Sequence, residues 1–351
     1  VGVRAIERLA LRYDATTIAT AMSAVIDQSE QHMRAAITQI PDGTYVFKDY
    51  VDDDGQSTKN IEIVARVEVK GDECLVDLSE SADQAPGPIN CTLNMARSGV
   101  YCALLSAADG SVMANSGAYR PVQVVSRPGS VVSCREPAPV ANRMATGHRI
   151  VTTVLGALAQ AIPNRIPAAY YGVSYVAALS APDRFEPEQK RVYFEIEVGG
   201  WGGHPEGDGA SGFSAGFHNL ANSPLEMCES LFPVTFTHYG FIEGSGGDGQ
   251  FRGGLGLARE WRLEAEHGSL SGSFERFTHA PYGLNGGSPG SLGRFVHITP
   301  TGSVDLPSKI SGVELRKGDR VRLETSGGGG WGDPADRLAD SRVADEQAGY
   351  T

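Results

Sequence analysis

A glycine-rich segment, residues 199–209, carries the densest group of polar side chains in the chain. It directly follows a strong strand pattern, and loops at strand ends hold reactive side chains on a rigid support. His204 with Asp208, and His218 further along, supply the residue types of a general base, the group that orients it, or metal ligands. Their spacing matches no compact metal signature, so we predict His204 and Asp208 as catalytic and His218 as a substrate contact. A turn whose histidine only hydrogen-bonds to backbone is the alternative.

The segment Ser223-Pro224-Leu225-Glu226 has the pattern of a capping box, with proline at the first helical position. In that arrangement Glu226 reaches back to the Ser223 amide. Glu229 follows on the same helical face, where a second carboxylate can raise the pKa of the first or help to bind a cation. We predict Glu229 as a catalytic residue and Glu226 as a substrate contact, with an ordinary solvated face as the alternative.

Arg252 is the lone basic residue of a second glycine array, residues 244–256. A guanidinium group in such a loop can bind a carboxylate or a phosphate through two parallel hydrogen bonds. We predict this catalytic role for Arg252. A wide β-bulge with a solvent-facing arginine explains the segment nearly as well.

Two other polar groups have simpler explanations. Residues 52–55, Asp-Asp-Asp-Gly, lack the alternating ligand spacing of a calcium loop and indicate an acidic hairpin turn. His148 lies in an apolar helical pattern beside Met144 and Val151, which is typical of a core histidine.

A third glycine run, residues 327–330, stands before Trp331-Gly332-Asp333-Pro334 and fits no ordinary strand or helix. Glycine permits backbone conformations and close approaches that other residues prevent. A phosphate loop requires Lys-Ser/Thr after its last glycine, and Trp-Gly follows here, so we do not expect nucleotide binding. The run instead predicts a tight loop packed under Trp331 and closed by an Asp-Pro turn, with Trp331 as a substrate contact.

Composition limits the class of protein. With 351 residues and 41% hydrophobic content, the chain can form one large domain or two. The net charge of −12, without a basic stripe, argues against nucleic acid as a partner. The longest apolar stretch, residues 150–162, is too short to span a bilayer, and no signal peptide is recognisable, so no membrane association is expected. Five cysteines without Cys-x-x-Cys spacing argue against a disulfide framework or structural zinc and favour the cytoplasm.

Hydrophobic periodicity predicts helices first and strands later. Helices are expected at 14–39, capped by Asp14 or Thr16, at 90–107 and at 142–161. A hairpin is expected from 61–69 through the turn at Gly71 to a strand ending at Asp77. The later expected strands are 191–198, with Val192, Phe194, Ile196 and Val198 on one face, and 257–263, 269–275, 293–299 and 319–325. This segregation predicts an α+β fold, with regions 1–182 and 183–351 separated at the Pro-rich stretch 181–190 or forming one continuous domain.

The order of the motifs along nearly the whole chain resembles the hydantoinase B/oxoprolinase family. The motifs that carry the resemblance are Ile40-Pro41-Asp42-Gly43, Gly87-Pro88-Ile89-Asn90, Tyr119-Arg120-Pro121, Asp208-Gly209, residues 223–229, Arg252-Gly253-Gly254-Leu255-Gly256, Gly283-Leu284-Asn285-Gly286-Gly287 and the final glycine-rich Trp-Gly-Asp-Pro. Family B subunits are longer at the N-terminus, and this chain, which begins at Val1, resembles their C-terminal part, as a processed or partial product.

The resemblance implies a division of labour in a hetero-oligomer. An A-type partner subunit, with ATP and Mg²⁺, phosphorylates the oxygen of a small cyclic amide or ketone enolate. The B-type subunit then takes the activated species onward by hydrolysis of the cyclic amide or, in the alternative branch, by carboxylation of the ketone. A divalent metal, Zn²⁺ or Mn²⁺, is expected in the absent N-terminal part. A non-catalytic scaffold for the A-type subunit is a third interpretation.

Overall fold

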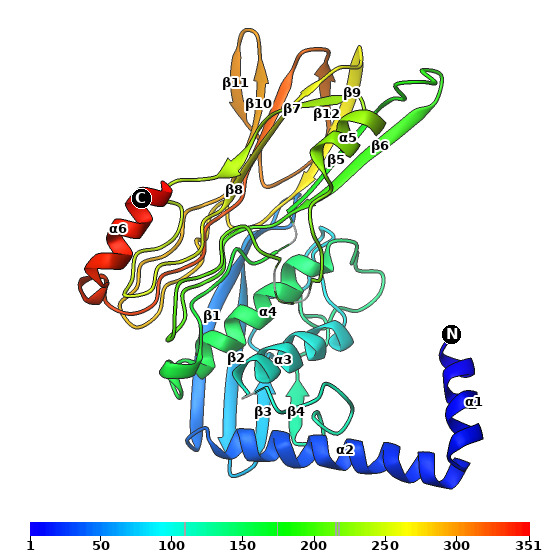
Figure 1. Ribbon diagram of the computed structural model, residues 1–351, viewed down its shortest axis with the longest axis vertical. Coiled ribbons are helices and arrows are strands. Elements are labelled where there is room, and N and C mark those ends of the chain that lie inside the picture. Colours follow the sequence, from blue (N-terminus) through cyan, green and yellow to red (C-terminus); the bar gives the residue numbers. More distant parts are fainter. Residues whose placement is uncertain (109, 174, 215, 217) are drawn as a thin grey trace.

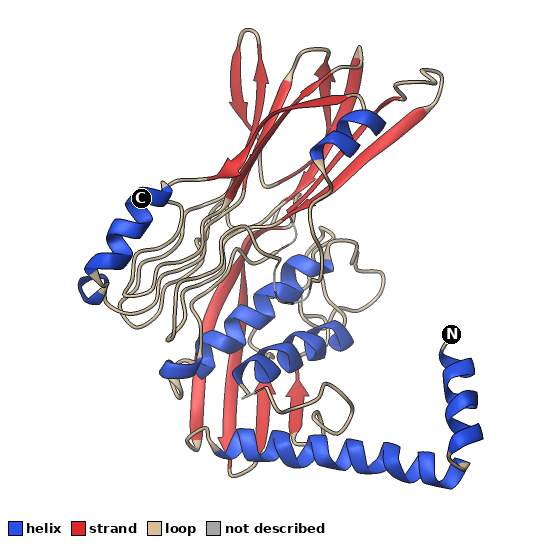
Figure 2. Cartoon of the chain, viewed as in Figure 1, coloured by secondary structure: helices blue, strands red, loops and turns tan. Residues whose placement is uncertain are grey.

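The chain folds into a lower part of helices on a sheet and an upper β-sandwich, joined by a layer of extended segments without regular secondary structure (Figure 1, Figure 2). This computed structural model describes residues 1–351 except 109, 174, 215 and 217. The helices are α1 (Gly2–Arg12), α2 (Ala15–Thr38), α3 (Leu93–Ala107), α4 (Arg143–Leu158), α5 (Leu225–Leu231) and α6 (Ala339–Ala348), with short 3-10 turns η1 (Pro163–Arg165) and η2 (Pro334–Asp336).

The described strands form three sheets. The strands are β1 (Gly43–Asp53), β2 (Lys59–Lys70), β3 (Glu73–Asp77), β4 (Val122–Val125), β5 (Tyr175–Pro182), β6 (Lys190–Glu197), β7 (Val234–Phe241), β8 (Leu257–Leu263), β9 (His267–Ser273), β10 (Arg294–Thr299), β11 (Gly302–Asp305), β12 (Lys309–Arg316) and β13 (Arg320–Glu324). Their orders are β1-β2-β3-β4, β11-β10-β13-β8-β7 and β12-β9-β5-β6. The predicted α+β class is confirmed.

The lower part agrees with the sequence pattern. Helix α2 begins where predicted, because the Asp14 carboxylate accepts the Thr17 amide at 2.8 Å. The predicted hairpin is β2 and β3, which pair antiparallel, and β4 adds to β3 in parallel. Helix α4 packs on α3 and on the sheet, and every residue from Ala145 to Leu158 is buried. Helix α1 and the first half of α2 project from the body (Figure 1).

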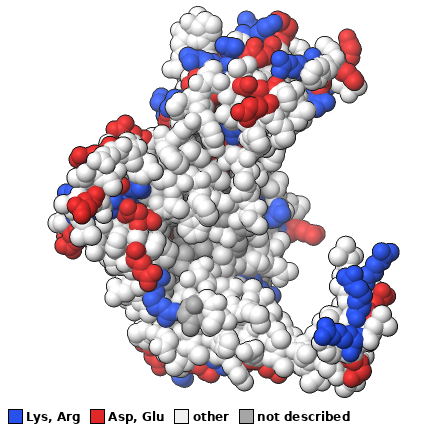
Figure 3. All heavy atoms as spheres, in the orientation of Figure 1, with Lys and Arg blue, Asp and Glu red and all other residues white. Residues whose placement is uncertain are grey.

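The upper part is a sandwich whose two sheets meet through buried aromatic rings. Tyr193 of β6 lies edge-on to Trp261 of β8, with the ring centroids 6.3 Å apart. On the face seen in Figure 3, acidic and basic side chains are intermixed over the upper part. The expected boundary between residues 182 and 183 falls in the turn joining β5 to β6, two strands that pair along their whole length. The division of the chain into two regions therefore stays a prediction.

Strand β6 alternates as expected, but its apolar face points outward at Val192 and Phe194, and only Val198, just beyond the strand, is buried. Val192 and Phe194 are 56% and 57% exposed, whereas Tyr193, Glu195 and Glu197 are buried. The reason is Arg259, a buried residue of β8 that forms ion pairs with both glutamates across the sandwich. An alternating sequence pattern defines the two faces of a strand, but it does not show which face will pack against the opposite sheet.

The glycine-rich segments 199–209, 246–254, 283–290 and 326–332 form what we call the glycine layer. Their backbones hydrogen-bond to one another, as in Gly247 N to Gly328 O at 2.9 Å and Gly203 N to Gly329 O at 2.8 Å. A Cβ atom on Gly328 would lie 1.9 Å from the carbonyl oxygen of Trp201, so only glycine fits. The predicted tight loop is therefore wrong, because the run is extended between neighbouring segments. The predicted Asp-Pro turn is confirmed, since Asp333 caps η2.

Candidate functional site

His204 lines a surface cavity of about 760 Å³. The cavity lies where α2, the C-terminal end of α3, η1 and the 204–206 turn come together. Its polar lining consists mainly of His32, Gln39, Ser106, Arg165, His204 and Glu206. This volume is in the range of small-molecule sites, which measure roughly 300–1,000 Å³.

Three side chains of the cavity are held in place by the backbone. Nδ1 of His32 lies 3.0 Å from the Ser111 carbonyl oxygen. Nδ1 of His204 accepts the Glu206 amide at 3.3 Å. Arg165 donates through Nη2 to the Ala107 carbonyl oxygen at 2.8 Å. Both imidazoles are half-buried, so each keeps part of its ring open to the cavity.

His218 lies beside His148, with their Nε2 atoms 3.4 Å apart. Nδ1 of His148 is 2.9 Å from the Tyr170 hydroxyl, and Tyr170 in turn stacks on Trp201. His148 is fully buried, as its apolar surroundings predict, and burial with the neighbouring His218 lowers its pKa well below the usual value. Burial lowers the pKa of His218 as well. The two rings therefore favour their neutral forms at neutral pH.

A second cavity, of about 540 Å³, lies along α3 and shares Ser106 with the first. It is lined by Cys102 and by the stacked rings of Tyr101 and Tyr119, whose centroids are 4.1 Å apart. A Cβ atom on Gly216, close to His218 in the chain, would lie 3.9 Å from the Cys102 sulfur. The two cavities thus border α3, and we call this surface the α3 face.

Asp208 and Arg252 meet in a separate ionic network. The Asp208 carboxylate binds Arg337 at 2.7 and 2.9 Å and accepts the Arg252 amide at 2.8 Å. Arg252 binds Asp345 of α6 at 2.9 Å and lies over the Tyr350 ring. Although burial raises the pKa of Asp208, the Arg337 and Arg252 contacts hold it below the usual value. These contacts fasten α6 to the glycine layer, and they do not join Asp208 to His204.

The predicted capping box at α5 is wrong. The helix begins at Leu225, Pro224 is its N-cap, and no side chain caps it. The Glu229 carboxylate instead accepts the Phe236 amide of β7 at 2.7 Å, while Glu226 is exposed. Helix α5 is thereby attached to the neighbouring strand through Glu229.

Trp331 lies inside the glycine layer. Its backbone exchanges two hydrogen bonds with Phe251, at 2.8 and 2.9 Å. Its indole nitrogen is buried, and no described residue accepts from it. The predicted roles of Trp331, Glu226 and Glu229 in substrate binding and catalysis remain predictions.

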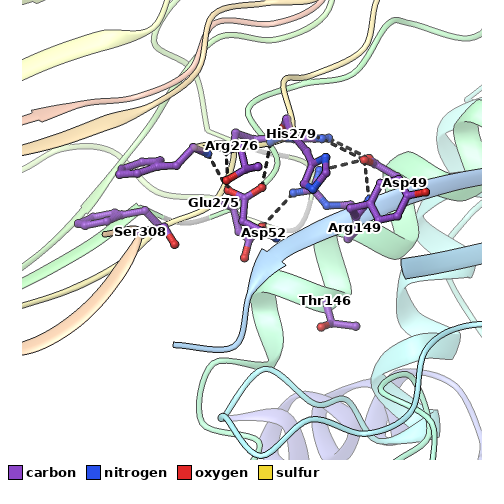
Figure 4. Close-up of polar contacts among 12 residues, drawn as sticks. Asp49, Asp52, Thr146, Arg149, Glu275, Arg276, His279 and Ser308 are labelled. Carbon is purple, nitrogen blue, oxygen red and sulfur yellow. Dashed lines mark hydrogen bonds and ion pairs between the residues drawn. The ribbon is translucent and has the colours of Figure 1, made fainter. Parts of the chain in front are cut away.

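The sequence pattern does not reveal a buried ionic cluster between the lower and upper parts (Figure 4). Asp49 of β1 contacts Arg149 at 3.2 Å and Arg276 at 3.1 Å. Glu275 contacts Arg149 at 3.1 Å and Lys309 at 2.6 Å. These side chains come from distant parts of the chain, so only the folded arrangement brings them together.

The acidic run at residues 52–54 belongs to this region and is not a solvated turn. It does join β1 to β2, but Asp52 and Asp54 are buried. Asp52 accepts the amides of Phe277 and His279 at 2.6 and 3.1 Å. The buried carboxylates stabilise contacts with chain segments far away in sequence.

Metal binding has no support among the residues that the structure describes, where no three His, Cys, Asp or Glu side chains gather closely enough to hold an ion. No helix among the described residues is both long enough and apolar enough to cross a membrane.

Comparison with known proteins defines the class. The hydantoinase B/oxoprolinase family model matches residues 1–334. The beta subunit of caprolactamase from Pseudomonas jessenii is 32% identical over 99% of this chain and 61% of its own length. The 5-oxoprolinase PfmaA of Pestalotiopsis fici is 29% identical over 85% of this chain and 23% of its own length.

Two solved structures share the fold. The crystal structure of ATP-dependent caprolactamase from Pseudomonas jessenii has a TM-score of 0.88 and 28% identity, covering 99% of this chain and 61% of that one. Nucleotide-free acetone carboxylase has a TM-score of 0.86 at 15% identity, covering 98% of this chain and 52% of that one, which is a likeness of fold alone. The chain belongs to the hydantoinase B/oxoprolinase family, and it spans about 60% of the length of the first curated relatives it matches.

Proposed function

We propose that this chain is a subunit of an ATP-dependent cyclic-amide hydrolase and acts on a substrate that a partner A-type subunit has phosphorylated. The observation that carries this proposal is the similarity, along almost the whole chain, to the ATP-dependent caprolactamase structure. Membership of the hydantoinase B/oxoprolinase family supports the same reaction class.

Phosphorylation solves the main chemical difficulty of amide hydrolysis. An amide carbon is a poor electrophile, and transferring a phosphoryl group to its oxygen creates a good leaving group. Water attack then needs a base and a group that stabilises developing negative charge. Imidazoles and an arginine on the α3 face are side chains of the right type for this step.

The predicted site residues divide into two groups under this proposal. His204 lines the 760 Å³ cavity, whose volume is in the range of small-molecule sites, and His218 lies beside the buried His148. Asp208, Glu229 and Arg252 contact other protein groups and are positioning residues in the proposal, holding α5, α6 and the glycine layer.

The proposed complex places ATP with Mg²⁺ on the A-type partner. The divalent metal, Zn²⁺ or Mn²⁺, is proposed to bind the part of the longer relatives that this chain does not span. We propose a cytoplasmic hetero-oligomer, consistent with the five free cysteines.

ATP turnover by the chain co-purified with its A-type partner tests the proposal. Hydantoin, 5-oxoproline, caprolactam and simple ketones are offered in turn, with labelled bicarbonate present. Ring-opened product without label is expected. Label in a keto acid would move the protein to the carboxylase branch, and turnover that no substrate stimulates would favour a scaffold.

A further inference from the structure

The two imidazoles of the 760 Å³ cavity have opposite hydrogen-bonding roles. A carbonyl oxygen only accepts, so the contact between Nδ1 of His32 and Ser111 O requires a proton on Nδ1. In the neutral ring, Nε2 of His32 then has a free lone pair. An amide only donates, so Nδ1 of His204, which accepts from Glu206 N, carries no proton. In that neutral ring the proton is on Nε2.

The cavity therefore combines a base with a hydrogen-bond donor. Backbone groups from different elements select the two tautomers, because Ser111 follows α3 and Glu206 lies in the 204–206 turn. The amide bound to Nδ1 of His204 leaves Nε2–H as the donor of that ring. Nε2 of His32, with its lone pair, is the base of the pair.

The other charged groups of the cavity complete the arrangement. Arg165 of η1 is held by its bond to the Ala107 carbonyl and contributes a permanent positive charge. Glu206 is the one acidic side chain among the residues lining the cavity. An anionic ligand thus meets one guanidinium and one imidazole donor here, in a chain whose net charge is −12.

We propose that this cavity holds the O-phosphorylated cyclic amide and that His32 is the general base of ring opening, an inference that rests on the proposed function. Nε2 of His32 takes a proton from water as the water oxygen bonds to the amide carbon. The carbon–nitrogen bond then breaks. His32 delivers the protons of that water, one after the other, to the ring nitrogen, which leaves as an amine.

This step leaves a ring-opened acyl phosphate. A second water, activated by the same base, releases a carboxylate and inorganic phosphate. Nε2–H of His204 and the Arg165 guanidinium bind the phosphoryl oxygens throughout. The phosphoryl group comes from ATP through the A-type partner of the proposed function.

The tautomers are tested first, in the chain with ¹⁵N-labelled histidine, by long-range proton–nitrogen correlation NMR. The signals are assigned with His32→Asn and His204→Asn, since asparagine can keep the Nδ1-like contact while removing Nε2. We expect the Nδ1–H form for His32 and the Nε2–H form for His204. The reverse tautomer at either position overturns the assignment of roles.

Activity of the complex gives the second test. His32→Asn should slow ring opening by about 10² to 10⁴ and abolish the acidic limb of the kcat/KM profile, with phosphorylation by the partner retained. His204→Asn should slow ring opening by about 10² to 10³ without changing the acidic limb of the kcat/KM profile. The exposed His238 provides a matched control, and His238→Asn should behave as the unsubstituted chain. Wild-type ring opening by His32→Asn would refute the proposal.

A ligand titration separates failure of the inference from failure of the proposed function. If the unsubstituted complex opens no cyclic amide, the proposed function fails, and the cavity is judged by NMR alone. Hydantoin and inorganic phosphate, each added to the chain, should shift the His32 and His204 signals and leave His238 in place. Unmoved signals at His32 and His204 would show that the cavity is not the site.

Discussion

Glu195 and Glu197 share a single buried guanidinium, that of Arg259. Arg259 lies between the rings of Phe236 and Tyr239, and two of its nitrogens have no partner among the described residues. Burial, partly opposed by Arg259 and reinforced by Glu195, raises the pKa of Glu197 to about 7. Two carboxylates face one arginine here. Protonation of Glu197 is favoured because the remaining negative charge, on Glu195, is then balanced by Arg259.

The contribution of Glu197 to stability should therefore fall as pH rises towards neutrality. It is opposite in sign to the contribution of His148 and His218, whose lowered pKa favours the folded chain as pH rises towards 6.5. The pKa of Glu197 is higher in the folded chain than its ordinary value of 4.5, so its contribution is complete below 4.5 and is lost as pH rises through 7. Glu197→Gln should remove this part of the pH dependence and stabilise the chain at pH 8 by roughly 2 to 3 kcal/mol relative to the unsubstituted protein. Denaturant unfolding between pH 5 and 8 measures this, with the exposed Glu314→Gln as control. Equal slopes in Glu197→Gln and unsubstituted chains would contradict the account.

At the scale of elements, close backbone packing defines the glycine layer. Gly327 and Gly328 would each place a Cβ atom 1.9 Å from a carbonyl oxygen of a neighbouring segment. No rotation of a flexible side chain relieves that contact, because the neighbours are backbone. The long glycine run is therefore explained by packing between segments.

Gly328→Ala should destabilise the chain by about 3 kcal/mol or more, at the upper end of the cost of overpacking. Gly2→Ala is the control, since nothing lies within 4 Å of its Cβ position. Thermal unfolding of both variants gives the comparison. Equal midpoints would mean that the segments are not packed this closely in solution.

Several elements with strong periodicity were predicted from the sequence, whereas others were missed, among them the amphipathic helix α1. Strand β8 coincides with its predicted range, and each end of α2 lies within one residue of the end predicted for that helix. Strand β1 was missed because Lys48, Asp49 and Asp52 interrupt its apolar pattern, and the partners of Asp49 and Asp52 lie far along the chain. The same limit applies to the site. His204 was predicted as a site residue because it lies in a glycine-rich loop. His32 lines the same cavity only because α2 packs beside the 204–206 turn, which the sequence does not show.

At the scale of the whole molecule, the cluster of Asp49, Arg149, Glu275 and Arg276 joins the two parts (Figure 4). Asp49 lies on the lower sheet, and Arg276 follows β9 of the sandwich. The side chains are between 0% and 8% exposed, so their charges depend on each other for compensation. The cluster should therefore couple the unfolding of the two parts.

Asp49→Asn should cost about 3 to 5 kcal/mol, because it leaves two buried guanidinium groups with one carboxylate fewer. Calorimetry should show a broader transition or two transitions in place of one. Asp305→Asn, which removes the partner of exposed Arg294, is the control and should change stability by less than about 0.5 kcal/mol. A single, unshifted transition for Asp49→Asn would contradict the coupling.

The most direct test of the central claim is an add-back experiment with the A-type partner, this chain and a cyclic amide that the complex accepts. ATP consumption and ring-opened product are measured for the partner alone, for this chain alone and for the two together. The account predicts product in amounts matching ATP consumed only when both are present. Ring opening by the partner alone, at the rate of the complex, would contradict it.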